Sequence, residues 1–223
     1  MKRFLVAFMA LILVGSISYS QEVMPNLAGG SKALLFQFGG LNNLAANNFN
    51  GGFGAKYYLS SFMAVRGVLQ FSSNSTTTPA NPAAGDVGVD GSTSNTTLGV
   101  GGAVEIHLGS GRVSPYLGGG VQFSTTSTES KNFATATPPA TPNQTTTKNA
   151  NGATTFTVFG MAGFEFFLWK EVSLAGEYQV GFSSTSMKDQ EVTTGATTTT
   201  TKQGSSSSIG IASQGFLTLA IYF

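Results

Sequence analysis

The chain contains no cysteine and very little charge. Without cysteine, neither a disulfide nor a thiolate metal site can form, so an exported form must be stabilised in another way. Charged residues make up 9% of the 223 residues, against about 25% in an ordinary soluble domain. The formal net charge is only +1, so we expect no nucleic-acid partner. A soluble protein with so few charges would be prone to associate.

Long apolar runs are also missing beyond the first residues. Two basic residues precede the apolar run Phe4–Val14, and small residues follow it. The run is shorter than the roughly 20 apolar residues that a membrane-spanning helix needs, and its flanks are typical of a secretory signal. We therefore predict a signal peptide over residues 1–20 and a short periplasmic segment over 21–31. A mature chain that enters a membrane must then cross it as strands.

What the sequence does have is an alternation of apolar residues with small or polar ones. In "LGVGGAVEIHL" (Leu98–Leu108), valine, isoleucine and leucine fall on one face, while glycine, alanine, Glu105 and His107 fall on the other. A period of two indicates a strand with two different faces. The same pattern predicts eight strands within one domain, residues 32–223, at about 32–40, 49–59, 62–73, 97–109, 114–124, 154–169, 172–184 and 208–223.

The connections between these strands fall into two classes. Tight turns are predicted at 59–62, 109–114 and 169–172, and long Ser/Thr-rich loops at 74–96, 125–153 and 185–207, with a shorter loop at 41–48. Strict alternation of short and long connections is typical of outer-membrane barrels. We therefore predict an all-β fold: an eight-stranded antiparallel up-and-down transmembrane β-barrel with flexible extracellular loops.

A soluble eight-stranded barrel of the lipocalin kind would alternate in the same way. The two differ in which face points outward. The polar face here carries residues small enough to fill a narrow lumen, and the opposite face is continuous valine, leucine, isoleucine and phenylalanine, which suits hydrocarbon. Aromatic residues near the strand ends are expected to form a girdle at the membrane interface. Its predicted members are Tyr57, Tyr58, Tyr116, Trp169 and Tyr222.

Three longer modules and the chain ending carry a family resemblance: "GFGAKYYLSSFMAVRGVLQF" (Gly52–Phe71), "GVGGAVEIHLGSGRVSPYLGGGVQF" (Gly99–Phe123), "GMAGFEFFLWKEVSLAGEYQVGF" (Gly160–Phe182) and "LTLAIYF" (Leu217–Phe223). The chain resembles the small outer-membrane barrels of Gram-negative bacteria, similar to OmpX, the OmpA transmembrane domain and porin-family barrels. The resemblance implies an outer-membrane location, a monomer, and contacts with outer-membrane lipids. It also implies periplasmic chaperones and a barrel-assembly machinery that recognises the last strand through Leu217, Leu219, Ile221 and Phe223.

Six ionisable residues are predicted to face the barrel interior: Lys56, Arg66, Glu105, His107, Glu165 and Glu177. A lone charge inside a lumen is costly, so these side chains are expected to pair or to be solvated. Two interpretations stay open. They form a static polar network that fills the lumen together with Gln37, Gln70, Gln122 and Gln179, or they line a gated, narrow path for solutes.

Enzymatic chemistry finds little support in the sequence. His107 is the only histidine, and therefore the only conventional general base near neutral pH. An acyl-chain enzyme would need it beside a serine nucleophile, yet "IASQG" (Ile211–Gly215) lacks the nucleophile-elbow spacing. We expect no catalysis, no metal and no cofactor.

The predicted long loops are where binding specificity would lie, because a rigid scaffold would hold them in place. Their Ser/Thr-rich composition does not identify a partner. The sequence therefore favours a structural or surface-interaction, adhesion-like role. The alternative is a narrow porin-like channel for ions or small solutes.

Overall fold

The computed structural model describes residues 28–38 and 51–223. The predicted signal peptide and the predicted connection 41–48 lie outside the described residues, as does most of the predicted periplasmic segment. Within the described part of the chain, no helix is long and apolar enough to cross a membrane.

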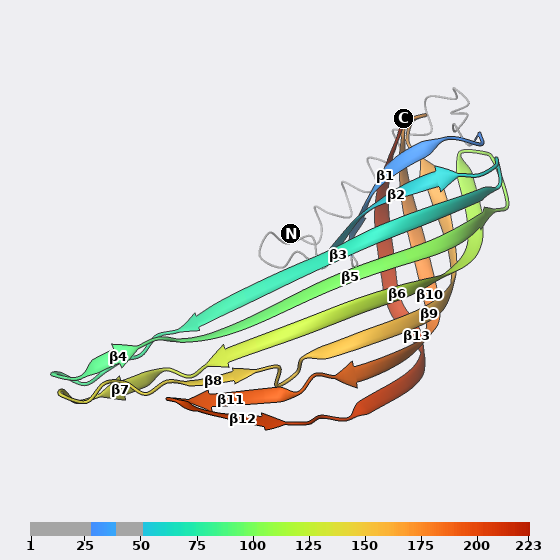
Figure 1. Ribbon diagram of the computed structural model, residues 1–223. Coiled ribbons are helices and arrows are strands. Elements are labelled where there is room, and N and C mark those ends of the chain that lie inside the picture. The colour runs from blue at the N-terminus through green and yellow to red at the C-terminus, as the bar shows by residue number, and fades with distance from the viewer. Residues whose placement is uncertain (1–27, 39–50) are drawn as a thin grey trace.

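Eight strands form a closed antiparallel barrel (Figure 1). Strands that follow one another around the wall are hydrogen-bonded, and the first and last strands pair in the register Ala33↔Tyr222 to Phe38↔Leu217, which closes the barrel. The predicted eight-stranded up-and-down barrel is therefore confirmed. Its strands are β1 (Lys32–Phe38), β2 (Gly51–Tyr58), β3 (Met63–Thr78), β5 (Gly91–His107), β6 (Val113–Lys131), β9 (Ala153–Phe167), β10 (Val172–Met187) and β13 (Ser205–Tyr222).

Tight turns join these strands at one end of the barrel. The turn between β2 and β3 is closed by the Leu59 amide, which donates to the Met63 carbonyl at 2.8 Å. The turn between β9 and β10 is closed in the same way, by the Leu168 amide and the Val172 carbonyl at 2.9 Å. The three connections predicted to be short are short in the structure, so they define a single turn end.

The apolar face of the wall points outward. On β5, Glu105 is fully buried inside the barrel, whereas its neighbour Val104 is 44% exposed. The same alternation runs around the barrel and leaves a belt of valine, leucine, isoleucine and phenylalanine on the outside. A soluble barrel would bury this belt and expose the charges, so the arrangement excludes the lipocalin alternative.

The prediction of three long structureless loops was wrong. Beyond the barrel the strands continue outward, and five short strands join them (Figure 1). The barrel sheet extends from β6 through β8 (Thr145–Lys148) and β11 (Gln190–Thr194) to β12 (Thr197–Thr201). A separate two-stranded ribbon of β4 (Val87–Val89) and β7 (Ala134–Ala136) lies at the far tip. We call the part of the sheet beyond the barrel the projecting sheet.

Threonine explains why these segments form strands. Its branched β-carbon suits an extended backbone, and hydroxyls on neighbouring strands bond to each other across the sheet. Such pairs join Thr97 to Thr126 and Thr193 to Thr198, each at 2.9 Å. The low-complexity composition suggested flexibility, but strand pairing that already exists in the barrel carries on into the threonine-rich segments.

The strands that form the projecting sheet are longer than a membrane crossing requires. A tilted strand crosses a bilayer with about 9–11 residues, whereas β3, β5 and β6 have 16, 17 and 19 residues. The outward-facing apolar belt ends on these strands at Phe71, Leu98 and Phe123. The surplus residues therefore extend into solvent on the side opposite the tight turns.

Candidate functional site

All six predicted interior ionisable residues lie together inside the barrel, near the turn end. They come from five strands, β2, β3, β5, β9 and β10, and each is exposed by 7% or less. We call this group the ion-pair cluster; its members are Lys56, Arg66, Glu105, His107, Glu165 and Glu177.

Glu105 is the centre of the ion-pair cluster. One of its carboxylate oxygens lies 2.8 Å from Lys56 Nζ and the other 3.1 Å from Arg66 Nη1. Lys56 reaches on to Glu165 at 3.1 Å, and Arg66 to Glu177 at 2.7 Å. Every buried charge therefore has an opposite charge beside it, which is the condition under which burial of ions is tolerated.

Hydroxyl groups complete the cluster. Tyr222 donates to Glu165 at 2.5 Å, Tyr116 donates to Glu177 at 2.9 Å, and Ser173 also donates to Glu165. The cluster has three carboxylates and only two permanent cations. Hydroxyl donors favour the ionised carboxylate, so they stabilise the negative charge that the cations leave uncompensated.

The prediction of an aromatic girdle is wrong for three of its members. Tyr58, Tyr116 and Tyr222 are buried inside the barrel rather than exposed at a membrane interface. Each lies two residues from a buried, inward-facing residue on its own strand: Tyr58 from Lys56, Tyr116 from Ser114 and Tyr222 from Ala220. Its ring must therefore point to the lumen as well. Tyr57 and Trp169 do point outward near the turn end, and they stay predicted members of the girdle.

His107 lies between a serine and a glutamate, the same sequence of side chains as in a catalytic triad. Its Nδ1 lies 2.8 Å from Ser114 Oγ, and its Nε2 lies 3.3 Å from Glu105. Ser114, however, is fully buried, and its hydroxyl donates to the Gly109 carbonyl at 2.5 Å. A nucleophile needs access to substrate, and the buried Ser114 hydroxyl is already hydrogen-bonded, so these contacts orient His107 within the cluster.

The residues predicted to carry the assembly signal lie on the outer side of β13. Leu217 and Leu219 are half-buried, and Ile221 and Phe223 are exposed, Phe223 by 72%. The Phe223 amide donates to the Lys32 carbonyl at 3.0 Å. The last residue is therefore tied to β1 while its ring is free to contact other molecules.

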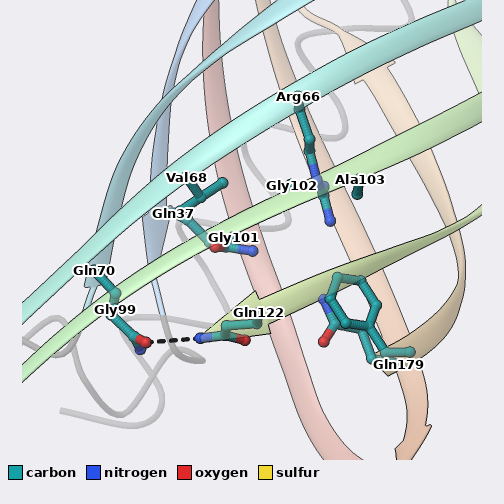
Figure 2. A pocket seen from close by; sticks show the side chains of 11 residues that line it. Gln37, Arg66, Val68, Gln70, Gly99, Gly101, Gly102, Ala103, Gln122 and Gln179 are labelled. Atoms are coloured by element: carbon teal, nitrogen blue, oxygen red, sulfur yellow. Dashed lines mark hydrogen bonds between the residues drawn. The ribbon is translucent and has the colours of Figure 1, made fainter. Parts of the chain in front are cut away.

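A cavity of about 230 Å³ lies in the lumen beside the cluster, and we call it the lumen cavity (Figure 2). Arg66 borders it from the cluster side, and glutamines from four strands reach into it. The predicted role of these glutamines as filler is incomplete, because they surround open space. The lining also includes Val68, Phe159 and glycines of β5; the glutamines are Gln37, Gln70, Gln122 and Gln179.

Comparison with known proteins assigns the family. A family model described as outer membrane protein beta-barrel domain matches residues 4–205. The chain belongs to this family. As a member of the outer membrane protein beta-barrel family, it is an outer-membrane protein. No curated protein matches the chain.

Two solved structures resemble this family member. One is Ail, the attachment invasion locus protein of Yersinia pestis, with 12% identity and a TM-score of 0.38, over 88% of this chain and 99% of that chain. The other is a major outer membrane protein from Thermus thermophilus, with 14% identity and a TM-score of 0.42, over 87% of this chain and 99% of that chain.

Sequence reasoning missed several hydroxyl groups of this outer-membrane barrel's interior. Ser114, Ser173 and the three buried tyrosines all bond to members of the ion-pair cluster. The alternation of inward- and outward-facing positions along a strand could have identified them. Each lies an even number of residues from a charged or buried inward-facing residue on its own strand. Among the described residues, no group of three or more His, Cys, Asp or Glu side chains could hold a metal ion.

Proposed function

We propose that this outer-membrane barrel acts at the cell surface, where the projecting sheet binds an extracellular partner and the barrel serves as its anchor. The observation that carries the proposal is the continuation of the barrel sheet through β8 and β11 to β12. Tight turns face the periplasm in such barrels and long connections face outward, which supports an extracellular place for this sheet. The proposed role is adhesion-like and non-enzymatic.

Strand β12 offers a suitable binding edge. It consists of five exposed threonines, and β11 pairs with only one of its sides; within the described residues it ends the sheet. Native proteins usually block such an edge with lysine, proline or a bulge, and β12 itself has none of these. An extended segment of a partner can add to an open edge through main-chain hydrogen bonds, with threonine hydroxyls beside it.

The alternative of a narrow channel receives less support. The ion-pair cluster occupies the lumen at the turn end, and its members and the tyrosines around it are buried. A solute path would require the contacts of Glu105 with Lys56 and Arg66 to break, each of them a close contact between buried charges. An interior that is closed at the turn end by buried side chains suits an anchor.

Removing the β11–β12 hairpin tests the surface role. We expect cells that express a chain in which a short turn replaces residues 190–201 to lose attachment to a protein-coated surface, because the open edge is gone. Attachment is counted against cells that express the full chain, and heat-modifiable electrophoretic mobility checks that the barrel is folded.

A matched deletion provides the control for the hairpin experiment. Shortening residues 79–90 removes the β4 tip and leaves the β12 edge in place, so attachment should persist. Equal attachment by the full chain and the hairpin deletion would contradict the proposed function.

We also propose that outer-membrane lipids contact the apolar belt and that periplasmic chaperones and the barrel-assembly machinery handle the chain before insertion. The exposed ring of Phe223 supports recognition of the last strand. A Phe223→Ala chain should insert several-fold more slowly and accumulate in the periplasm, as measured by cell fractionation after a pulse of expression. Insertion at the normal rate would contradict this role.

A further inference from the structure

We propose that the lumen cavity binds one uncharged sugar ring through its glutamine side chains. The cavity has the features of a binding site: several convergent polar groups, an aromatic side chain and room for a ligand. Figure 2 shows Gln37, Gln70, Gln122 and Gln179 reaching into the same space from β1, β3, β6 and β10.

Glycines of β5 create the space in front of the glutamines. Gly99 stands opposite Gln70 in the sheet register, and Gly101 stands opposite Gln122. A β-carbon at Gly99 would come within 3.1 Å of Gln70 Oε1, and one at Gly101 within 3.3 Å of a backbone oxygen. Side chains at these positions would take up the room that now lies between the amides.

The glutamines have hydrogen-bonding capacity left over. Gln122 donates to Gln70 Oε1 at 2.9 Å, and Gln179 donates to Glu177 at 2.6 Å. A glutamine amide has two N–H donors and an oxygen with two lone pairs, so each of these three amides can make further bonds. The side chain of Gln37 makes no hydrogen bond to another described residue, and all four are half-buried. Unused donors and acceptors therefore face the cavity together.

The charge of the lining favours an uncharged ligand. Arg66 borders the cavity, but Glu105 and Glu177 already neutralise it. Within the described lining no other charged side chain is present, so an ionic ligand would lose its hydration without gaining a counter-charge. Hydroxyl groups, in contrast, both donate and accept, as the amides do.

The size and the apolar part of the lining point to a single ring. A volume of about 230 Å³ is below the roughly 300–1,000 Å³ of sites for drug-sized ligands. Phe159 and Val68 provide apolar surface, which the C–H groups of a sugar ring can cover while its hydroxyls bond to the amides.

The test is a titration of the full chain, refolded in a detergent that contains no sugar. Glucose, galactose and N-acetylglucosamine are added separately, with glucuronate as a charged control and cyclohexanol as an apolar control. The side-chain amide resonances of the four glutamines are followed by NMR. We expect saturable shifts with at least one of the three neutral sugars and none with either control.

Two variants locate the site. The double variant Gln70→Leu and Gln122→Leu should weaken binding about tenfold or more, because it removes several hydrogen bonds. Gln203→Leu, a glutamine substitution in the connection between β12 and β13, away from the cavity lining, should leave the affinity unchanged. Val68→Phe fills the cavity without removing a polar group and should also abolish binding; electrophoretic mobility confirms that it is folded.

A last comparison distinguishes between two ligands, a free sugar and the end of a longer glycan. The affinity of a trisaccharide that ends in the bound sugar is compared with that of the methyl glycoside of the same sugar. Equal affinities mean that the cavity binds the end of a longer glycan. No binding of the trisaccharide means that the cavity binds only a free sugar. The absence of saturable shifts with all three neutral sugars in the folded barrel overturns the proposal. Equal binding by the Val68→Phe variant overturns it as well.

Discussion

Replacing Glu105 with glutamine should lower the free energy of unfolding of the barrel by about 3–5 kcal/mol. Glu105 is fully buried and lies within 3.1 Å of both Lys56 and Arg66. Glutamine keeps the shape of the side chain but removes its charge, so two buried cations lose their shared counter-charge. The remaining carboxylates, Glu165 and Glu177, each contact only one of these cations.

The measurement is a urea titration of the chain refolded into lipid vesicles, with the Glu129→Gln variant as its matched control. Glu129 lies 3.0 Å from Lys131 in the projecting sheet, where both side chains are exposed. An exposed pair contributes about 1 kcal/mol or less, so its loss should shift the transition only slightly. Equal shifts for the two variants would show that the ion-pair cluster is no more important than a surface ion pair.

The second large effect is expected on the opposite face of the same strand. Val104 precedes Glu105 and points outward, near the middle of the apolar stretch of β5. Arginine at this position must place its charge in hydrocarbon, which costs about 2–4 kcal/mol at the centre of a bilayer. Val104→Arg should therefore lower the free energy of unfolding by that amount in vesicles.

The control for Val104→Arg is Thr96→Arg. Thr96 lies on the same strand with the same parity, but beyond the end of the apolar belt at Leu98. Surface substitutions usually change stability by less than about 0.5 kcal/mol, so this variant should unfold almost as the parent chain does. A similar loss from both variants would mean that Val104 does not face lipid.

The barrel itself could be predicted from the sequence because strand parity is strict. A shift of one residue would exchange the faces of Val104 and Glu105, so a pattern with one apolar face permits only one arrangement. The errors at Tyr58 and Tyr222 arose where position near a strand end was used instead of parity. The ion-pair cluster was predictable as a set, but its contacts were not, because they depend on which strands become neighbours around the barrel.

The projecting sheet could not be predicted in the same way. Both of its faces meet water, so its strands show no alternation, and "TTTTT" of β12 looks the same in every register. The hydrogen-bonded partner decides whether such a segment becomes a strand. The lumen cavity is hidden for a related reason: it exists because Gly99 stands opposite Gln70, a relation between strands far apart in sequence.

The closure of the barrel by β1 and β13 also affects how the protein folds. Ala33 pairs with Tyr222, so the last seam joins residues from almost opposite ends of the chain. Contacts of such high sequence separation are slow to form, because the entropy of loop closure must be overcome before they contribute any stability. Until then the wall has two open edges that can pair with other chains. The barrel can therefore lose its two aggregation-prone edges only after β13 has been synthesised.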